Sequence, residues 1–442
     1  TQSATAFRGF GGPQGMVGIE RVMDHVAHHL GIDPLDVRRV NFYAASDKVS
    51  PGGTATAHGT ADGTPQTTPY HMNVEDFVLH EIVEELEATS RYRARRSAIA
   101  EWNSASRVLK KGIALTPVKF GISFTLTHLN QAGALVHVYH DGSIHMNHGG
   151  TEMGQGLFQK VAQVAAGSFC VPLESVKITA TDTARVPNTS ATAASSGSDI
   201  NGMAVRSACD KIRERMAMHL AETRQLKPKN VQFRAGRVQA GADEMSFAEA
   251  ARECYEGRVS LSATGFYQTP RIQWDRIRGM GRPFYYFAYG AAVSEVVLDT
   301  LTGENRILRT DILHDAGASL NPAIDIGQIE GGFVQGAGWL TTEELVWDQQ
   351  GRLLTHAPST YKIPACSDRP DIFNVSLWSK GRNIEETIHR SKAVGEPPLM
   401  LGISALLALS DAVAACGDPY PALDAPATPE RLLNAVNRMR AP

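Results

Sequence analysis

A carboxylate, Glu396, precedes Pro397 and Pro398, and an almost wholly apolar stretch follows over residues 400–409. A stretch that is apolar on every side predicts a helix buried in a protein core. A charged carboxylate at the mouth of a buried element is costly unless it is paired or used. Glu396 is therefore either a helix-start carboxylate that offsets the helix dipole or a catalytic group. The local sequence alone favours the helix start, since acidic residues are common in first helical turns.

Three loops rich in Gly, Ser, Thr and Ala precede helical patterns, over residues 149–156, 188–198 and 317–328. Small residues let backbone N–H groups face a ligand, and helix N-termini favour anions. A phosphorylated cofactor could be held in this way, with Gln155 and Gln328 as side-chain donors. Ordinary loop chemistry is the alternative for each loop alone. The first loop is neither a GxGxxG dinucleotide loop nor a Walker A loop, because it lacks GK[ST].

Other site chemistries find little support. The fifteen histidines are scattered, and His137 and His145 fit pleat positions of strands better than a metal site. The five cysteines form no CxxC, which argues against a disulfide framework or an iron–sulfur site here and fits a reducing, cytoplasmic compartment. A formal charge of -3 gives no electrostatic case for nucleic acid or an anionic membrane. No run of eighteen apolar residues predicts a transmembrane helix.

The order of elements predicts an α+β fold of two related lobes with mixed sheets and helices. Residues 1–111 are mainly helical, and a basic cluster at residues 91–96 is interpreted as a solvated helix face. A Gly-, Ala-, Thr- and Pro-rich insertion spans residues 44–68. Hairpin, Gly-rich loop and helix then follow one another twice, which predicts a first lobe at 112–225 and a second at 226–442.

One helix of the first segment is predicted from apolar residues at helical spacing, and it is predicted to end at Gly31. The apolar residues are Ile19, Val22, Met23, Val26 and Leu30. Asp33 and Pro34 then predict the N-cap and first residue of the next helix. Helical patterning resumes at residues 74–78 and continues through Leu86.

Six blocks, in order along nearly the whole chain, resemble signatures of the xanthine dehydrogenase and aldehyde oxidase molybdenum hydroxylases. They are residues 5–14, 119–125, 149–156, 192–195, 325–328 and 392–399. The residues of these blocks resemble those of xanthine dehydrogenases most closely. The resemblance implies the fold of the molybdopterin-binding domain of that family. It also implies that this chain is the C-terminal part of a molybdopterin-binding subunit.

The resemblance also implies roles for single residues. Glu396 matches the family's general base, a kind of group that typically contributes ~10²–10⁴-fold. A carboxylate beside an apolar helix has a raised proton affinity, which suits base chemistry near neutral pH. Phe10 and Phe124 match rings that sandwich a flat substrate, and Thr125 matches a substrate contact. Arg8 and Ala194 match positions whose backbone lies next to molybdenum, which the cofactor rather than a protein side chain holds. The cofactor surroundings are matched by Arg8, Met153, Gly154, Gln155, Ala193, Ala194, Ser195, Ser196, Gly197 and Gln328.

The implied activity is molybdenum-dependent hydroxylation of purines, hypoxanthine to xanthine to urate, with water as the oxygen source. An aldehyde oxidase or another N-heterocycle hydroxylase of the same family is the first alternative. An inactive cofactor-binding fragment is the second alternative, and the missing phosphate motifs disfavour a nucleotide-binding protein. The implied cofactor is molybdopterin with molybdenum, with 2Fe-2S clusters and FAD on other domains or chains.

The family's further active-site parts precede the Phe10 loop, and they include a glutamine near molybdenum and the glutamate and arginine that select purines. This chain begins at that loop, so we expect it to hold half of a cofactor pocket. The expected partners are the upstream half of the molybdenum subunit, the iron–sulfur and FAD domains or subunit, and a purine substrate. We expect an oligomer that binds neither nucleic acid nor membrane.

Overall fold

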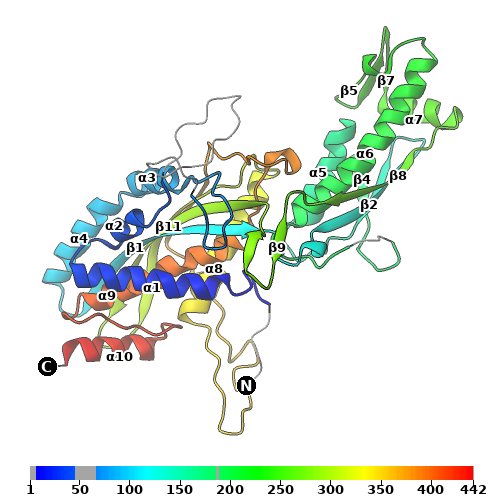
Figure 1. Ribbon diagram of the computed structural model, residues 1–442. Coiled ribbons are helices and arrows are strands. Elements are labelled where there is room, and N and C mark those ends of the chain that lie inside the picture. Colours follow the sequence, from blue (N-terminus) through cyan, green and yellow to red (C-terminus); the bar gives the residue numbers. More distant parts are fainter. Residues whose placement is uncertain (1–5, 45–65, 186–188, 442) are drawn as a thin grey trace.

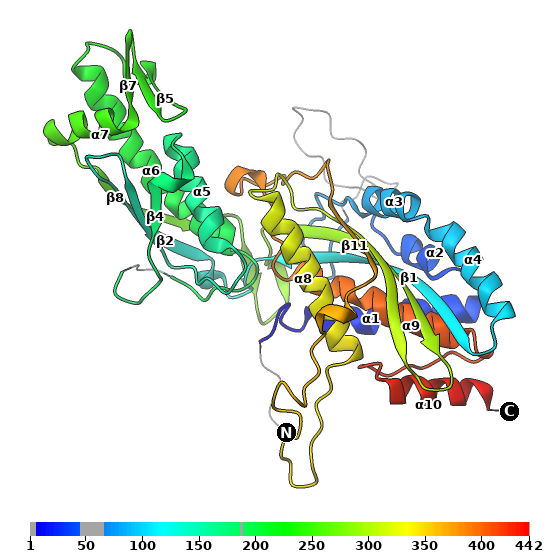
Figure 2. The same ribbon diagram turned by 180° about the vertical axis from the view of Figure 1, so that it is seen from behind.

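A computed structural model describes residues 6–44, 66–185 and 189–441. The chain folds into two lobes set at an angle to each other (Figures 1 and 2). The small lobe comprises the described residues from 131 to 268, and the large lobe comprises the other described residues. Both lobes combine helices with sheets, and parallel and antiparallel strand pairs occur in each main sheet. The predicted α+β class with mixed sheets is therefore confirmed.

The small lobe is built on a mixed sheet in the order β4-β3-β2-β8. Helices α5 and α6 pack on this sheet around one apolar core, and the ribbon β5-β6-β7 and helix α7 lie at the end far from the large lobe (Figure 1). Strands β2 and β3 form the predicted hairpin. The elements are β2 (Gln131–Val138), β3 (Ile144–His148), α5 (Leu157–Phe169), β4 (Val176–Ile178), α6 (Gly197–Glu222), β5 (Val231–Arg234), β6 (Arg237–Ala240), β7 (Asp243–Ser246), α7 (Phe247–Glu256) and β8 (Ser262–Gln268).

The large lobe has a sheet in the order β1-β11-β12-β13 with helices on both faces. Side chains alternate along a strand, so Ile113 and Leu115 of β1 pack under α3 and α4, whereas Ala114 and Val118 face α8 and α9. The strands are β1 (Leu109–Ile122), β9 (Gln273–Asp275), β10 (Met280–Arg282), β11 (Tyr286–Asp299), β12 (Asn305–His314) and β13 (Ile372–Leu377). The helices are α1 (Gly12–Leu30), α2 (Pro34–Val40), α3 (Leu79–Ser90), α4 (Tyr92–Ala105), α8 (Pro322–Thr341), α9 (Ile403–Ala414) and α10 (Pro429–Arg440).

The lobe boundaries differ from the predicted ones. Strand β1, which we placed at the start of the lobe 112–225, pairs along its whole length with β11. Strand β8, which we placed in the lobe 226–442, completes the sheet of the small lobe beside β2. The chain leaves the large lobe after β1 and returns after β8. Because these strand pairs join residues far apart in the sequence, the order of elements alone cannot reveal the division.

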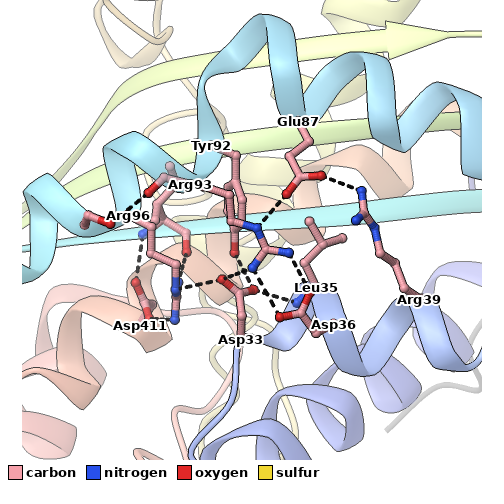
Figure 3. A network of polar contacts seen from close by, with 11 residues as sticks. Asp33, Leu35, Asp36, Arg39, Glu87, Tyr92, Arg93, Arg96 and Asp411 are labelled. Atoms are coloured by element: carbon pink, nitrogen blue, oxygen red, sulfur yellow. Dashed lines mark hydrogen bonds and ion pairs between the residues drawn. The ribbon is translucent and has the colours of Figure 1, made fainter.

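Two predictions within residues 1–111 were wrong. The helix predicted from residue 74 begins at Leu79, because Val74 and Phe77 reach the core from a non-helical segment that precedes it. The basic cluster is not a solvated face. Figure 3 shows Arg93 and Arg96 among the carboxylates of Asp33, Asp36, Glu87 and Asp411, with which they form ion pairs. Most of the insertion predicted at 44–68 lies outside the described residues.

The stretch after Glu396 forms a short 3-10 helix, η6 (Pro397–Gly402), that continues into α9. All twelve residues of α9 except Asp411 and Ala414 are buried, so the predicted buried helix is confirmed. Helix α8 packs closely against η6, with the Pro398 side chain lying at Gly332 and the two backbones in contact at Gly336 and Gly402. A Cβ atom at Gly336 would lie 1.9 Å from the carbonyl oxygen of Leu399, and one at Gly402 would lie 2.4 Å from the backbone nitrogen of Ala337. These two glycines therefore set a backbone-to-backbone contact.

Helix α1 lies on the outer surface of the large lobe, nearest the viewer in Figure 1. The face that it buries contains Glu20 and Asp24, whose carboxylates pair with the buried Arg38 of α2 at 2.5 and 2.8 Å. Of the five apolar residues predicted at helical spacing, Met23 is half-buried and four are exposed: Ile19, Val22, Val26 and Leu30. Helix α1 thus buries two carboxylates together with apolar residues such as Ala27, and it exposes an apolar stripe.

Candidate active site

The Glu396 carboxylate lies where the two lobes meet. Its Oε2 accepts a hydrogen bond from Ser195 Oγ at 2.8 Å, and its Oε1 accepts one from the backbone N–H of Gly9 at 3.1 Å. The Glu396 backbone N–H in turn donates to Ser195 Oγ at 2.7 Å. The side chain makes no capping bond to η6, so it is turned away from the helix that it precedes. Residues from two distant parts of the chain, Gly9 and Ser195, therefore hold this carboxylate.

Burial raises the pKa of Glu396 above its usual value, because the ionised form loses hydration. The hydrogen bonds from Ser195 and Gly9 and the charge of Arg8 act in the opposite direction. The net rise gives Glu396 a greater affinity for a proton than an exposed carboxylate has. A carboxylate of raised pKa that still accepts hydrogen bonds is suited to act as a general base.

Arg8 ties the loop of Gly9 to the large lobe. Its Nε donates to the carbonyl of Gly395 at 2.5 Å, and its two terminal nitrogens donate to Gln335 Oε1 and the carbonyl of Gln328 at 3.2 and 3.3 Å. Burial lowers the pKa of Arg8 from its usual value. The side chain therefore positions the segment next to Glu396 and braces it against α8.

A cavity of about 610 Å³ opens beside Glu396 between the lobes. It collects most of the residues that the sequence assigned to a cofactor site, namely Arg8, Met153, Gly154, Gln155, Ala193, Ala194, Ser195, Gly197, Gln328 and Glu396. Ser196 does not line it; this side chain is buried and its Oγ donates to the carbonyl of Ala193 at 3.4 Å. Three loops predicted from their small residues thus converge on one space.

The loop before α5 is braced by its own side chains. Gln155, expected to donate to a ligand, has its Oε1 bonded by the N–H of Met153 at 2.5 Å and donates from Nε2 to the carbonyl of Thr151 at 2.8 Å. Glu152 accepts bonds from the N–H groups of Gly154, Gly156 and Phe158 at 2.9–3.0 Å. These bonds stiffen the cavity wall, and the amide of Gln155 is engaged within the loop.

The loop before α6 has two consecutive residues in the left-handed region, Ala194 at φ 55° and Ser195 at φ 56°. This turn aims Ser195 Oγ at Glu396 and brings the start of α6 to the cavity wall. Non-glycine residues adopt this backbone conformation at a cost, and such strain gathers at functional sites. A Cβ at Gly395 would meet Ser195 Oγ at 2.9 Å, so the glycine lets the two loops approach.

The residues assigned to substrate lie apart from the cavity wall. Phe10 is 75% exposed, Phe124 is half-buried and Thr125 is exposed, and none of the three lines the cavity. The backbone of Phe124 is fixed by Asn130, whose side-chain amide bonds both its N–H and its carbonyl at 2.8 and 2.9 Å. The structure thus brings Glu396 together with most of the residues predicted to surround a cofactor, and leaves the two rings near the surface.

Sequence reasoning missed several buried charged side chains around the cavity. The Asp199 carboxylate accepts a hydrogen bond from Tyr286 Oη at 2.7 Å, and Tyr286 Oη accepts one from the N–H of Ala393 at 2.9 Å. Burial raises the pKa of Asp199 to about 7. Lys392 pairs with Asp315 at 2.6 Å and Asp76 at 2.7 Å. Among the buried charged residues at the cavity, Lys392 and Asp325 lie within the six blocks that resemble the family.

Whether these residues fit a molybdopterin can be judged from the cavity wall. Three helices, α5, α6 and α8, present residues of their first two turns to it, among them Leu157, Gly197 and Asp325. Helix N-termini favour anions such as the cofactor's phosphate. Apart from its two chain neighbours, no residue has an atom within 4 Å of a Cβ built at Gly154, so this part of the wall borders open space. Within residues 6–44, 66–185 and 189–441, no cluster of His, Cys, Asp or Glu could hold a metal ion. The helix starts and the open wall at Gly154 fit a phosphorylated cofactor.

The chain is similar in sequence to xanthine dehydrogenases. The chain is 45% identical to a xanthine dehydrogenase/oxidase of Gallus gallus over 98% of its length, and 44% identical to a xanthine dehydrogenase of Oryza sativa subsp. japonica over 97%. In each case it spans 29% of the relative's length.

Solved structures share the fold. Quinoline 2-oxidoreductase from Pseudomonas putida 86 superposes with a TM-score of 0.80 at 23% identity, over 98% of this chain and 53% of that one. Aldehyde oxidoreductase from Desulfovibrio gigas gives 0.73 at 23% identity, over 98% and 42%.

Two family models match, both described as a molybdopterin cofactor-binding domain. One covers residues 85–370 and the other residues 1–42. The first match alone spans more than half of the chain and includes the loops before α5, α6 and α8. The chain therefore belongs to the molybdopterin cofactor-binding domain family.

Proposed function

We propose that this chain is part of a molybdenum-dependent oxidoreductase that hydroxylates purines, hypoxanthine to xanthine to urate, with water as the oxygen source. The observation that carries the proposal is the Glu396 carboxylate, held by Ser195 and Gly9 at the edge of the cavity. The xanthine dehydrogenases at about 45% identity support the purine substrate. Because the chain covers 29% of those relatives, the remaining parts of the enzyme are proposed on other segments or chains.

Glu396 would act as the general base. When bound, the molybdenum cofactor supplies the oxygen nucleophile and accepts the two electrons that leave the substrate. Glu396, whose pKa burial raises, takes the proton of that nucleophile on a carboxylate oxygen. Ser195 and Gly9 hold the carboxylate in one orientation, and Arg8 fixes the adjoining carbonyl of Gly395. Phe10, Phe124 and Thr125 are proposed to contact the flat substrate at the outer side of the site.

The cavity wall would hold the cofactor. The starts of α6 and α8 suit its phosphate, and Gln328, which lines the cavity, offers hydrogen-bonding groups. Arg8 and Ala194 line the cavity at the positions proposed to approach molybdenum. Electrons would leave through 2Fe-2S and FAD groups on domains outside this chain. We further propose a cytoplasmic, oligomeric enzyme.

Replacing Glu396 with glutamine tests the catalytic role. Glu396→Gln keeps the side-chain volume and removes the basic oxygen, so molybdenum content should be unchanged while turnover of xanthine falls at least ~100-fold. The matched control is Glu386→Gln, whose side chain is 85% exposed and which should keep wild-type turnover. Turnover of the Glu396→Gln enzyme within tenfold of wild type would contradict the base assignment.

The substrate class is tested by comparing turnover of xanthine with turnover of an aromatic aldehyde on the complete enzyme. The purine proposal predicts a higher kcat/KM for xanthine. A higher value for the aldehyde would replace the purine proposal with an aldehyde oxidase. Metal analysis tests the remaining alternative, because near-stoichiometric molybdenum without turnover of either substrate would indicate a cofactor-binding fragment.

A further inference from the structure

The segment that leads to Glu396 is irregular backbone at the wall of the cavity. Residues 392–396 belong to no helix or strand, and residues 391–394 are buried. Buried backbone N–H groups need hydrogen-bond partners. An irregular segment cannot find them in the ladder of a sheet or in the turns of a helix. The position of Glu396 therefore depends on single contacts that other parts of the fold make with this segment.

Two of these contacts come from the start of α6, in the other lobe. The Glu396 N–H donates to Ser195 Oγ at 2.7 Å. The Ala393 N–H donates to the hydroxyl of Tyr286 at 2.9 Å, and that hydroxyl donates to Asp199 Oδ2 at 2.7 Å. Ser195 directly precedes the N-cap of α6, and Asp199 lies in its first turn. The two contacts therefore fix residues 393 and 396 to one helix of the small lobe.

The Tyr286 side chain is well suited to this bridge. It begins β11, and its ring packs among buried residues that include Ile122 and Ala288. Burial, together with the charge of Asp199, raises the pKa of Tyr286 well above its usual value, so the hydroxyl keeps its proton. A protonated hydroxyl donates one hydrogen bond and accepts others. It can therefore bond Asp199 and the Ala393 N–H at the same time, from a position that the packing of the ring fixes.

We propose that Tyr286 is a positioning residue for Glu396, and that its hydroxyl sets where the base lies by tying the backbone of Ala393 to α6. Asp199 orients this hydroxyl by accepting its hydrogen bond, which leaves a lone pair for the Ala393 N–H. A displacement of about 1 Å at a reacting group can lower the rate ~10²-fold, so a contact three residues away is sufficient to affect turnover. The role of Glu396 rests on the proposed function, whereas the anchoring of residues 393–396 does not.

Hydrogen–deuterium exchange of the complete enzyme tests the anchoring. Tyr286→Phe removes only the hydroxyl, so the peptide that covers residues 393–396 should exchange at least ~tenfold faster, as expected for the loss of one hydrogen bond. Tyr285→Phe is the matched control, because Tyr285 is buried to the same extent and packs in the same cluster. It should leave exchange of that peptide at the wild-type rate. Wild-type exchange in Tyr286→Phe would overturn the proposal.

Turnover per bound molybdenum separates positioning from a loss of stability. In Tyr286→Phe, kcat for xanthine expressed per bound molybdenum should fall at least ~tenfold, and in Tyr285→Phe it should not. The KM of Tyr286→Phe should stay unchanged, because the residues proposed to contact the substrate are not altered. A hydroxyl that only stabilised the fold would lower the amount of loaded enzyme and leave kcat per molybdenum at the wild-type value. That result would overturn the positioning role.

Two variants of Asp199 test the link to α6 without altering Tyr286. Asp199→Asn keeps an oxygen that can accept the hydrogen bond of the hydroxyl, whereas Asp199→Ala does not. Residues 393–396 should therefore exchange faster in Asp199→Ala than in Asp199→Asn, and equal rates would contradict the link. Exchange does not require turnover, so the two proposals can fail separately. An active Glu396→Gln enzyme would reject the base and leave the anchoring intact, whereas wild-type exchange in Tyr286→Phe would reject the anchoring alone.

Discussion

At the scale of single residues, the proposed chemistry depends on the contacts that set the pKa of Glu396. Burial raises its pKa and the Ser195 hydroxyl lowers it, so each of these effects shifts the pKa in a known direction. Local sequence favoured a helix-start carboxylate, and the structure shows instead a side chain that makes no cap and accepts bonds from residues 195 and 9. Neither partner could be identified from sequence spacing, because Ser195 is 201 residues away.

Removing the Ser195 hydroxyl should shift the pH dependence of turnover. In Ser195→Ala the ionised form of Glu396 loses a hydrogen-bond donor, so its pKa rises further. A base must be ionised to act, and the acid limb of the pH profile of kcat/KM should therefore move to higher pH. Ser97→Ala, at an exposed serine of α4, is the control and should leave that limb in place. An acid limb that stays fixed or moves to lower pH in Ser195→Ala contradicts this account.

Asp199 should make stability depend on pH. Burial raises its folded-state pKa to about 7 from an ordinary value of 3.8, so the folded state binds this proton more tightly than the unfolded state. Its contribution to stability is present below about pH 4 and is lost as pH rises through about 7. Asp199→Asn should therefore reduce the fall in thermal midpoint between pH 5 and pH 8.

The matched control for this prediction is Asp210→Asn, an exposed carboxylate on the same helix, α6. Its midpoints should follow the wild-type curve at every pH. If Asp199→Asn also follows the wild-type curve, Asp199 does not titrate differently in the folded and unfolded states.

At the scale of elements, local patterns predicted the type of most helices and strands. Asp33 caps α2 as its position before Pro34 indicated, with its carboxylate accepting the N–H of Leu35 at 2.8 Å. The loops before α5, α6 and α8 were found from their small residues, because backbone that approaches a ligand needs small side chains. The start of α3 was missed, since a burial pattern at helical spacing also fits an irregular segment over a core.

The direction in which α1 faces shows the limit of pattern reading. An apolar stripe predicts that a helix packs, but it does not say against what. Here the buried side is defined by the ion pairs of Arg38 with Glu20 and Asp24, which join α1 to α2. Such a pair of carboxylates around one arginine leaves no periodic signal in the sequence. Only the folded lobe shows which side of the helix is covered.

Replacing Arg38 should destabilise the large lobe strongly. Arg38→Met leaves two buried carboxylates without a partner, which costs about 3–5 kcal/mol. Arg39→Met is the matched control, because the Arg39 side chain is 37% exposed in its pair with Glu87 and such pairs contribute about 0–1 kcal/mol. Chemical denaturation of both variants measures the difference. Equal losses of stability would show that the Arg38 cluster does not fix α1.

At the scale of the whole molecule, the cavity exists because two lobes meet. Several polar contacts cross the junction there, including Ser195 with Glu396, Asp199 with Tyr286, Gln163 with Asn321, and Lys160 with Asp325. Strand pairing over long sequence separations creates this division, so sequence order misassigned β1 and β8. The six blocks that resemble the family predicted which residues surround one site. Only the strand pairing shows to which lobe each block belongs.

Removing one ion pair between the lobes should destabilise the cavity and weaken retention of the cofactor. Lys160 of α5 and Asp325 of α8 are both buried and form an ion pair across the junction. Lys160→Met leaves the Asp325 carboxylate without its cation, which should lower the thermal midpoint and reduce the molybdenum retained after dialysis. Lys177→Met, at an exposed lysine of β4, should change neither quantity. Wild-type molybdenum retention in Lys160→Met would show that the pair does not stabilise the loaded cavity.

The glycine contact between α8 and η6 also has a consequence for how this chain tolerates mutation. Glu396 immediately precedes η6 and Gln328 lies on α8, and the two helices touch through backbone at Gly336 and Gly402. Where helices touch through side chains, successive core substitutions shift their spacing by small steps. At Gly336 and Gly402 backbone meets backbone, so we expect substitutions in the surrounding core to change the distance from Glu396 to α8 only slightly. The geometry around Glu396 should therefore tolerate substitutions in the hydrophobic core that packs against η6.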